Sequence, residues 1–301
     1  MKKFLSKIMV FLILLTIIYI ITAQTFRYLD LQVKGESGRM RYIHNELIAD
    51  SIIMGSSRAL HHYDPDILGN YYNVGENRMG IIFSMGRLQL LKQRRMPHML
   101  IYDVEPDYDL LQDDNSTYLT NLRPYYHRPG IREIFWDVDS TERIKMLFPF
   151  YQYNSRLLKL LADWRHPAMS YTKGYSPYEG CQAIEKETLP QNKHDRKKYE
   201  YLHKLIAECK RRHTSLIFTA SPQLSYQSDS VFRRFKLICQ QEGIPFLNHY
   251  CDTAYTHHRA LFHNANHLNR EGASLYSKEI KKEMSLRKFN ASIKLPKKDK
   301  Q

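Results

Sequence analysis

The chain has few of the residues and spacings that mark metal proteins or disulfide-stapled folds. Among its 301 residues there are only four cysteines, Cys181, Cys209, Cys239 and Cys251. None of them forms a CxxC pair or another zinc spacing, and the histidines contain no HExxH pattern, so we expect neither a metal nor another cofactor. Cys209 and Cys239 fall in predicted helices, where a buried thiol acting as a small apolar side chain is the default.

The chain also lacks an internal repeat and a second long apolar run. Its single uncharged run covers residues 8–23 and follows Lys2, Lys3 and Lys7. A basic start followed by an apolar stretch is typical of an export signal. Because Ile21 would occupy a cleavage-site position that requires a small residue, an uncleaved anchor of residues 1–25 is favoured. The positive-inside rule then predicts a single-pass protein of the cell membrane, with a cytoplasmic N-terminus and an extracytoplasmic globular domain.

Negative charge is in deficit, since the formal net charge is +14. A basic surface can meet nucleic acid, anionic lipid or acidic polysaccharide. Export argues against nucleic acid, which we do not expect as a partner. A hydrophobic content of 43%, with 22 tyrosines and 13 phenylalanines, excludes wholesale disorder and provides for a full core.

After the anchor, strand and helix patterns alternate along most of the chain. Apolar runs bounded by turn residues predict strands at 51–54, 71–74, 99–104, 215–219 and 245–247. Helical spacing predicts helices at 81–93, 194–213, 228–242 and 270–284. This alternation predicts an α/β fold, a three-layer sandwich around a parallel, flavodoxin-like sheet of about five strands.

The remaining segments define the expected domain organisation. Residues 26–48 form a connector, 49–288 the α/β domain and 289–301 a poorly ordered basic tail. Residues 107–191 interrupt the alternation and are interpreted as a partly helical insertion. Its aromatic cluster between Tyr118 and Tyr153 has two interpretations, which are stacking on sugar rings and packing of the insertion.

Polar residues follow three of the predicted strands and precede the last helix. Gly55-Ser56-Ser57-Arg58 follows the first strand, Gly75 the second and Asp103 the third, while His267 stands just before the last helix. In parallel sheets these positions meet at one edge, where ligands bind. A serine and a histidine there can act as nucleophile and general base. Taken singly, each has a structural alternative, because Gly-Ser-Ser often forms only a turn and an N-cap.

These strings resemble the sequence blocks of the SGNH/GDSL hydrolase superfamily. Gly55-Ser56-Ser57-Arg58 resembles its nucleophile block, Asn73-Val74-Gly75 its second block, and Asn264 to His267 its last block. The forms are similar to exported, membrane-anchored members linked to polysaccharide O-acylation. The resemblance implies an SGNH-like fold, with Ser57 as the nucleophile and His267 as the base.

The resemblance also implies an oxyanion site and substrate contacts. The oxyanion would meet the Ser57 backbone N–H and a donor from the loop that contains Gly75, Asn77, Arg78 and Gly80. Arg58 would either bind an anionic group of the substrate or form a salt bridge at a helix start.

Three departures from the family pattern leave catalytic power open. Asn264 stands where the family has an acid, Arg78 stands near a glycine position, and Asp103-Val104-Glu105 replaces the third-block asparagine. We therefore carry two hypotheses. The first is a serine esterase or O-acyltransferase acting on an acylated carbohydrate. The second is a catalytically weak SGNH-fold protein that binds a glycan or scaffolds a membrane-bound O-acyltransferase.

Overall fold

The computed structural model describes residues 2–153, 156–165, 171–182, 193–224 and 228–294. The chain divides into two compact units. The smaller unit combines Met1–Leu47 with Ser116–Ser170, and the larger unit combines Ile48–Asn115 with Tyr171–Gln301. The predicted insertion is therefore divided, since its central part belongs with the N-terminal residues and its two ends belong with the α/β unit.

A five-stranded parallel sheet forms the centre of the larger unit, and its strand order is β2-β1-β3-β4-β5. The strands are β1 (Ser51–Gly55), β2 (Tyr71–Asn73), β3 (Met99–Asp103), β4 (Ser215–Ala220) and β5 (Phe246–Asn248). This is the flavodoxin-like order. Gly55 pairs with Asp103, which pairs with Thr219, so three neighbouring strands end at the same level.

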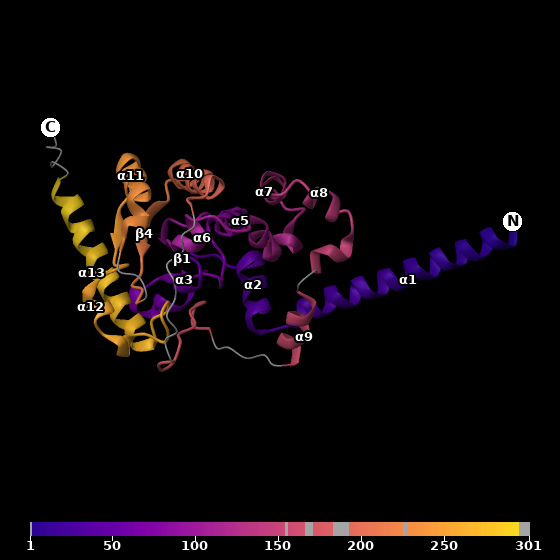
Figure 1. Cartoon of the computed structure of the whole chain (residues 1–301), viewed down its shortest axis with the longest axis horizontal. Helices are drawn as coiled ribbons and strands as arrows, with labels where there is room; N and C mark the ends of the chain where they lie inside the picture. Colours follow the sequence, from indigo (N-terminus) through magenta and orange to yellow (C-terminus); the bar gives the residue numbers. More distant parts are fainter. Residues whose placement is uncertain (1, 154–155, 166–170, 183–192, 225–227, 295–301) are drawn as a thin grey trace, which may run out of the picture. The chain divides into compact units, whose positions relative to one another are not determined.

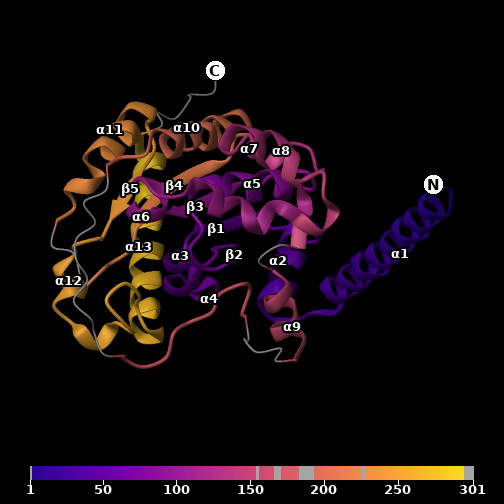
Figure 2. The same cartoon turned by 45° about the vertical axis from the view of Figure 1, so that its right-hand side comes forward.

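Helices cover both faces of this sheet, which confirms the predicted α/β fold (Figures 1 and 2). The long helices are α5 (Ile81–Lys92), α10 (Arg196–Arg211), α11 (Arg233–Glu242) and α13 (Arg270–Lys294). The short ones are α3 (Ser57–His62), α4 (Pro65–Leu68), α6 (Pro106–Asp109), η3 (Ser230–Phe232), α12 (Thr253–Thr256) and η4 (Arg259–Leu261). α13 runs beyond its predicted end and takes in the start of the predicted basic tail, whose residues 295–301 lie outside the described residues.

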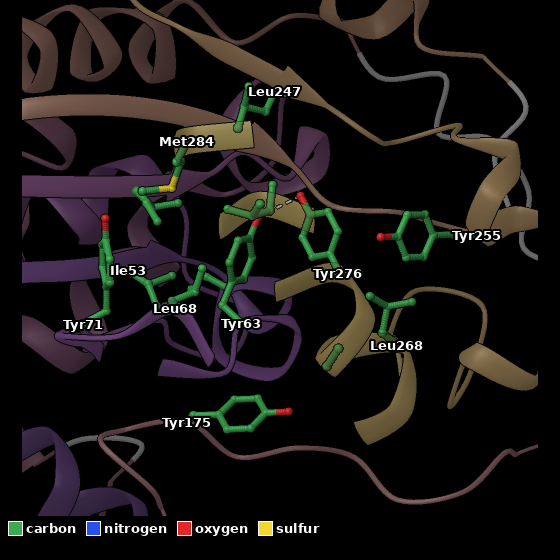
Figure 3. Packing of buried hydrophobic residues seen from close by; sticks show 14 of the residues in the cluster. Ile53, Tyr63, Leu68, Tyr71, Tyr175, Leu247, Tyr255, Leu268, Tyr276 and Met284 are labelled. Carbon is green, nitrogen blue, oxygen red and sulfur yellow. Dashed lines mark hydrogen bonds between the residues drawn. The ribbon is translucent and has the colours of Figure 1, made fainter. Parts of the chain in front are cut away.

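The face of the sheet under α3 and α13 has an aromatic core (Figure 3). Ile53 and Ile101 of the sheet pack with Tyr63 and Tyr276, all fully buried. The Tyr63 hydroxyl donates to Asp103 Oδ1 at 2.6 Å and lies 3.2 Å from the Tyr276 hydroxyl. Buried tyrosines need such partners, so this core also fixes the carboxylate at the end of β3.

The smaller unit is helical. It contains α1 (Lys2–Gln32), α2 (Gly35–Asn45), η1 (Asn115–Tyr125), α7 (Ile131–Val138), α8 (Glu142–Lys145), η2 (Pro149–Tyr153) and α9 (Leu157–Arg165). Val33, Tyr153 and Leu160 form a small core. Tyr118, Tyr125, Tyr126 and Tyr153 are buried, which favours packing over sugar stacking for these four rings.

Helix α1 is long and apolar enough to cross a membrane. Its best 18-residue window has a mean hydropathy of 2.6, and none of that window is buried. At 1.5 Å per residue its 31 residues extend about 46 Å, which exceeds the ~30 Å hydrocarbon core of a bilayer.

All four cysteines are free thiols. Cys209 in α10 and Cys239 in α11 are buried, as predicted, and burial raises the pKa of each thiol to about 12. Cys181 is exposed.

Candidate catalytic site

The turn after β1 places Ser57 at the carboxyl end of the sheet. Gly55 has φ +143°, and a Cβ there would lie 2.5 Å from the Asp103 carbonyl oxygen, so the close approach of β1 to β3 requires glycine. Ser56 is the N-cap of α3, and its Oγ accepts from the Arg58 N–H at 3.4 Å. Ser57 is the first residue of α3 and is 7% exposed.

His267 lies directly against this serine. Its Nε2 is 2.9 Å from Ser57 Oγ, and its Nδ1 is 3.0 Å from Asn264 Oδ1. The same amide oxygen accepts from the backbone N–H groups of Asn266 (3.0 Å) and His267 (2.9 Å). An oxygen that only accepts requires the proton on Nδ1, so the Nε2 lone pair points at the serine hydroxyl. The three residues expected to act together are thus in contact.

The electrostatic surroundings keep His267 neutral. Burial, and after it the nearby His61 and Arg58, lower the pKa of His267 to about 3. A neutral imidazole can accept the serine proton, but a low pKa makes it a weak base. Position 264 supplies an amide, and among the described residues no carboxylate contacts the ring to stabilise the imidazolium.

A stack of rings surrounds His267. Tyr178 lies over His61, with centroids 3.9 Å apart, and over His263, with centroids 4.5 Å apart. It also meets His267 edge-on at 5.2 Å. Sequence reasoning missed Tyr178, because it falls in an irregular part of the predicted insertion where no motif marks it.

Arg58 is enclosed by protein groups. It is 0% exposed, its Nε donates to Ser221 Oγ at 3.1 Å, and its Nη1 donates to Gln223 Oε1 at 3.0 Å. Its Nε lies 3.9 Å from Asp103 Oδ2. Burial alone would lower the pKa of Arg58, but Asp103 and Glu105 outweigh it and the pKa is raised. These contacts enclose Arg58 and favour the salt-bridge alternative over a substrate contact.

The Asp103 carboxylate is bound by groups other than Ser57. Its Oδ2 accepts from Ser221 Oγ and its Oδ1 from the Ser221 N–H, both at 2.9 Å. With Tyr63 and Arg58 these partners hold the carboxylate inside the protein. A carboxylate aimed at an oxyanion would oppose catalysis, and this arrangement avoids it.

His62 joins this buried network to the loop that carries His267. Its Nε2 accepts from the Leu268 N–H at 3.0 Å, and its Nδ1 lies 2.8 Å from Ser221 Oγ. Burial, followed by the charge of Arg58, lowers the pKa of His62 well below the usual value. A neutral His62 therefore connects the first sequence block to the last one.

The loop after β2 was expected to supply a second oxyanion donor from Gly75 to Gly80. The Gly75 N–H donates to Asn73 Oδ1 at 2.9 Å, so a donor from this loop would have to come from another residue. A Cβ at Gly75 would lie 2.6 Å from the Leu60 backbone nitrogen, so only glycine at this position allows α3 to pack this closely against the loop. Gly80 likewise permits close contact with the Tyr108 carbonyl and is the N-cap residue of α5.

Asn77 and Arg78 stay at the surface of the same loop. Asn77 is half-buried, with Oδ1 3.0 Å from His61 Nε2. Arg78 is exposed and takes φ +58°, a left-handed conformation that favours glycine. Arg78 therefore has the backbone conformation expected of a glycine at this position, although its side chain is that of an arginine.

A second buried carboxyl lies beside the serine turn. Glu105 follows β3 and is 7% exposed, and Ser56 Oγ donates to its Oε2. Burial is the main reason that the pKa of Glu105 is raised to about 7. Its position after Asp103-Val104 was visible in the sequence, but its contact with Ser56 was not.

Within the described part of the chain, no three His, Cys, Asp or Glu side chains are grouped so that they could hold a metal ion.

No protein-family model matches the chain, and no curated protein matches it. Among solved structures it is similar to one from Bacteroides fragilis NCTC 9343 described as "a putative acylhydrolase". The two share 12% sequence identity at a TM-score of 0.45, over 82% of this chain and 96% of the other. At that distance the comparison leaves the functional argument to the geometry of the site.

Proposed function

We propose that the chain is an SGNH-like serine esterase or O-acyltransferase. The observation that carries the proposal is the pair of distances at His267, 2.9 Å to Ser57 Oγ and 3.0 Å to Asn264 Oδ1. A nucleophile, a base within hydrogen-bond reach and a group that orients the base form the arrangement used in acyl transfer.

In the proposed reaction Ser57 Oγ attacks the carbonyl carbon of an ester while His267 Nε2 takes the hydroxyl proton. The tetrahedral oxyanion collapses, the ester C–O bond breaks, and His267 returns the proton to the leaving alkoxide. The acyl-serine is then attacked by water in an esterase, or by a sugar hydroxyl in a transferase, with His267 again accepting the proton. The bond between the acyl carbon and Ser57 Oγ breaks, and His267 returns the proton to Ser57 Oγ.

The oxyanion would be met by the Ser57 backbone N–H, because the first N–H groups of a helix have no intrahelical acceptor. Asn77 is the proposed second contact, since its side chain is held beside the site by His61. An acylated carbohydrate remains the substrate class that we propose, on the resemblance of the sequence blocks. An extracytoplasmic location is proposed with it, from Lys2, Lys3 and Lys7 in the first turns of α1.

A second candidate function follows from Asn264 and from the low pKa of His267. Without a carboxylate partner, the same fold would serve as a catalytically weak protein. It would bind an exported glycan or scaffold a membrane-bound O-acyltransferase.

Labelling with a fluorophosphonate probe tests the first candidate against the second. We expect the full chain in detergent to label, and we expect Ser57→Ala and His267→Ala to abolish the labelling. Ser285→Ala serves as the matched control, because Ser285 is exposed on α13 and should leave labelling intact. A folded wild-type chain that fails to label would reject the enzyme in favour of the binding or scaffold function.

A further inference from the structure

The smaller unit contains a basic cavity beside the C-terminal end of α1. Its volume is about 380 Å³, and its walls include Arg27 and Asp30 of α1, Arg41 and Asn45 of α2, and Arg128. Three arginines thus line one cavity that no part of the proposed acyl chemistry uses.

The single carboxylate of the cavity already has a partner. Asp30 Oδ1 lies 3.3 Å from Nη2 of Arg156, which is itself 5% exposed. The charges of Arg27, Arg41 and Arg128 are therefore not cancelled by Asp30, and the cavity is electropositive. Such a cavity favours an anion.

Backbone and amide oxygens hold two of these arginines in place. Arg41 Nη2 donates to the Val33 carbonyl at 3.2 Å, and Arg128 Nη2 donates to Asn45 Oδ1 at 2.6 Å. Neutral acceptors position a guanidinium without neutralising it. The planar donor fork of arginine matches the oxygens of a phosphate group.

The position along α1 indicates where that phosphate comes from. The uncharged run ends at Ala23, and Arg27 follows four residues later, which is about 6 Å along a helix. The headgroup layer on each side of a bilayer is about 5–7 Å thick. With α1 in the bilayer, Arg27 lies at the depth of the lipid phosphates.

Exposed apolar side chains of the same unit agree with this placement. Ile144, Leu147 and Phe148 are 66%, 75% and 67% exposed. The segment after α8 leads into η2, which packs on α1, where the Phe26 and Tyr153 rings are 5.5 Å apart. Figures 1 and 2 show α8 on the side from which the N-terminal part of α1 projects. Apolar side chains at that level would enter the interfacial layer.

We propose that this cavity binds the phosphate of an anionic phospholipid headgroup. The lipid would hold α1, α2 and the Arg128 loop together at the membrane surface. Basic cavities beside transmembrane helices recognise such headgroups. This binding site is separate from the proposed acyl chemistry and does not depend on it.

Lipid titration of the full chain tests this proposal. The protein is delipidated in a neutral maltoside detergent and titrated with phosphatidylglycerol, phosphatidylcholine or inorganic phosphate, and native mass spectrometry counts the bound lipid. We expect one phosphatidylglycerol to bind more tightly than either alternative. Arg27→Gln should weaken binding about fivefold, and Arg27→Gln with Arg128→Gln more than tenfold.

The variants are chosen to leave the fold intact. Arg27 is exposed, so replacing its side chain removes no buried contact. Arg132→Gln is the matched control, since Arg132 is 52% exposed in the same unit but does not line the cavity. Equal lipid binding by the wild type and the double variant would overturn the proposal. Inorganic phosphate that binds as tightly as phosphatidylglycerol would show a soluble phosphate compound to be the occupant, and the lipid assignment would be wrong.

Discussion

At the scale of single residues, Asn264 decides how strong the proposed base can be. Its amide oxygen accepts from His267 Nδ1 and from two backbone N–H groups, so it orients the ring fully. It carries no charge, however, and the pKa of His267 stays near 3. Asn264 therefore orients the His267 ring without raising its basicity.

Asn264→Asp should supply the missing charge without changing the contacts, because a carboxylate oxygen accepts the same three hydrogen bonds. We expect the pKa of His267 to rise and kcat/KM for a simple ester to increase about tenfold or more. A pH-stat assay of ester hydrolysis measures the rate, and Ser57→Ala in the same background is the control. An unchanged rate would mean that proton transfer by His267 does not limit the reaction.

At the scale of elements, the alternation of strands and helices was readable from sequence, because the strands are short apolar runs, two of which end at a turn residue, β1 at Gly55 and β3 at Asp103. The predicted bounds agree closely with β1, β3 and α5. The contact of Ser57 with His267 also followed from motifs at one sheet edge. The role of Arg58 did not, because its partners Ser221 and Gln223 lie more than 160 residues away.

The hydrogen bonds that join α3 to the loop before α13 could not be predicted either, because their partners are also far apart in the sequence. His62 makes that link, since it accepts from the Leu268 N–H and contacts Ser221 Oγ. No sequence pattern marks Ser221 or Leu268 as a partner of His62. A pair of adjacent histidines suggests a metal site more readily than a buried hydrogen-bonding side chain. Tertiary contacts of this kind are not encoded in local spacing.

His62→Gln should destabilise the larger unit by about 1–3 kcal/mol, because buried hydrogen-bonding groups lose their partners. The effect has a defined pH dependence. The pKa of His62 is lowered in the folded chain, so the unfolded chain binds the proton more readily below about pH 6.5. The stability given by neutral His62 is therefore complete above that pH and is lost as the pH falls.

Denaturant unfolding of the full chain in detergent, at pH 7.5 and pH 5.5, measures this difference. We expect the gap between wild type and His62→Gln to be smaller at the lower pH. A gap that widens with acid would contradict a neutral His62 in the folded chain.

At the scale of the whole molecule, the predicted export of the larger unit is open to a direct measurement. Cys181 is exposed and Cys251 is partly exposed, while Cys209 and Cys239 are buried. A membrane-impermeant maleimide should therefore label intact bacterial spheroplasts that express the chain, and Cys181→Ser should remove most of the label. Labelling that appears only after lysis would place Cys181 inside the cell and reverse the expected topology.

The interleaving of the two units has a consequence for biosynthesis. The first stretch of the smaller unit ends at Leu47, and its second stretch starts at Ser116. A ribosome adds about 5–20 residues per second, so several seconds pass before η2 and α9 emerge to cover Val33 and Phe26. During that interval the nascent helices after the anchor have an uncovered apolar surface. The chain should therefore depend on chaperones most while its middle third is being translated.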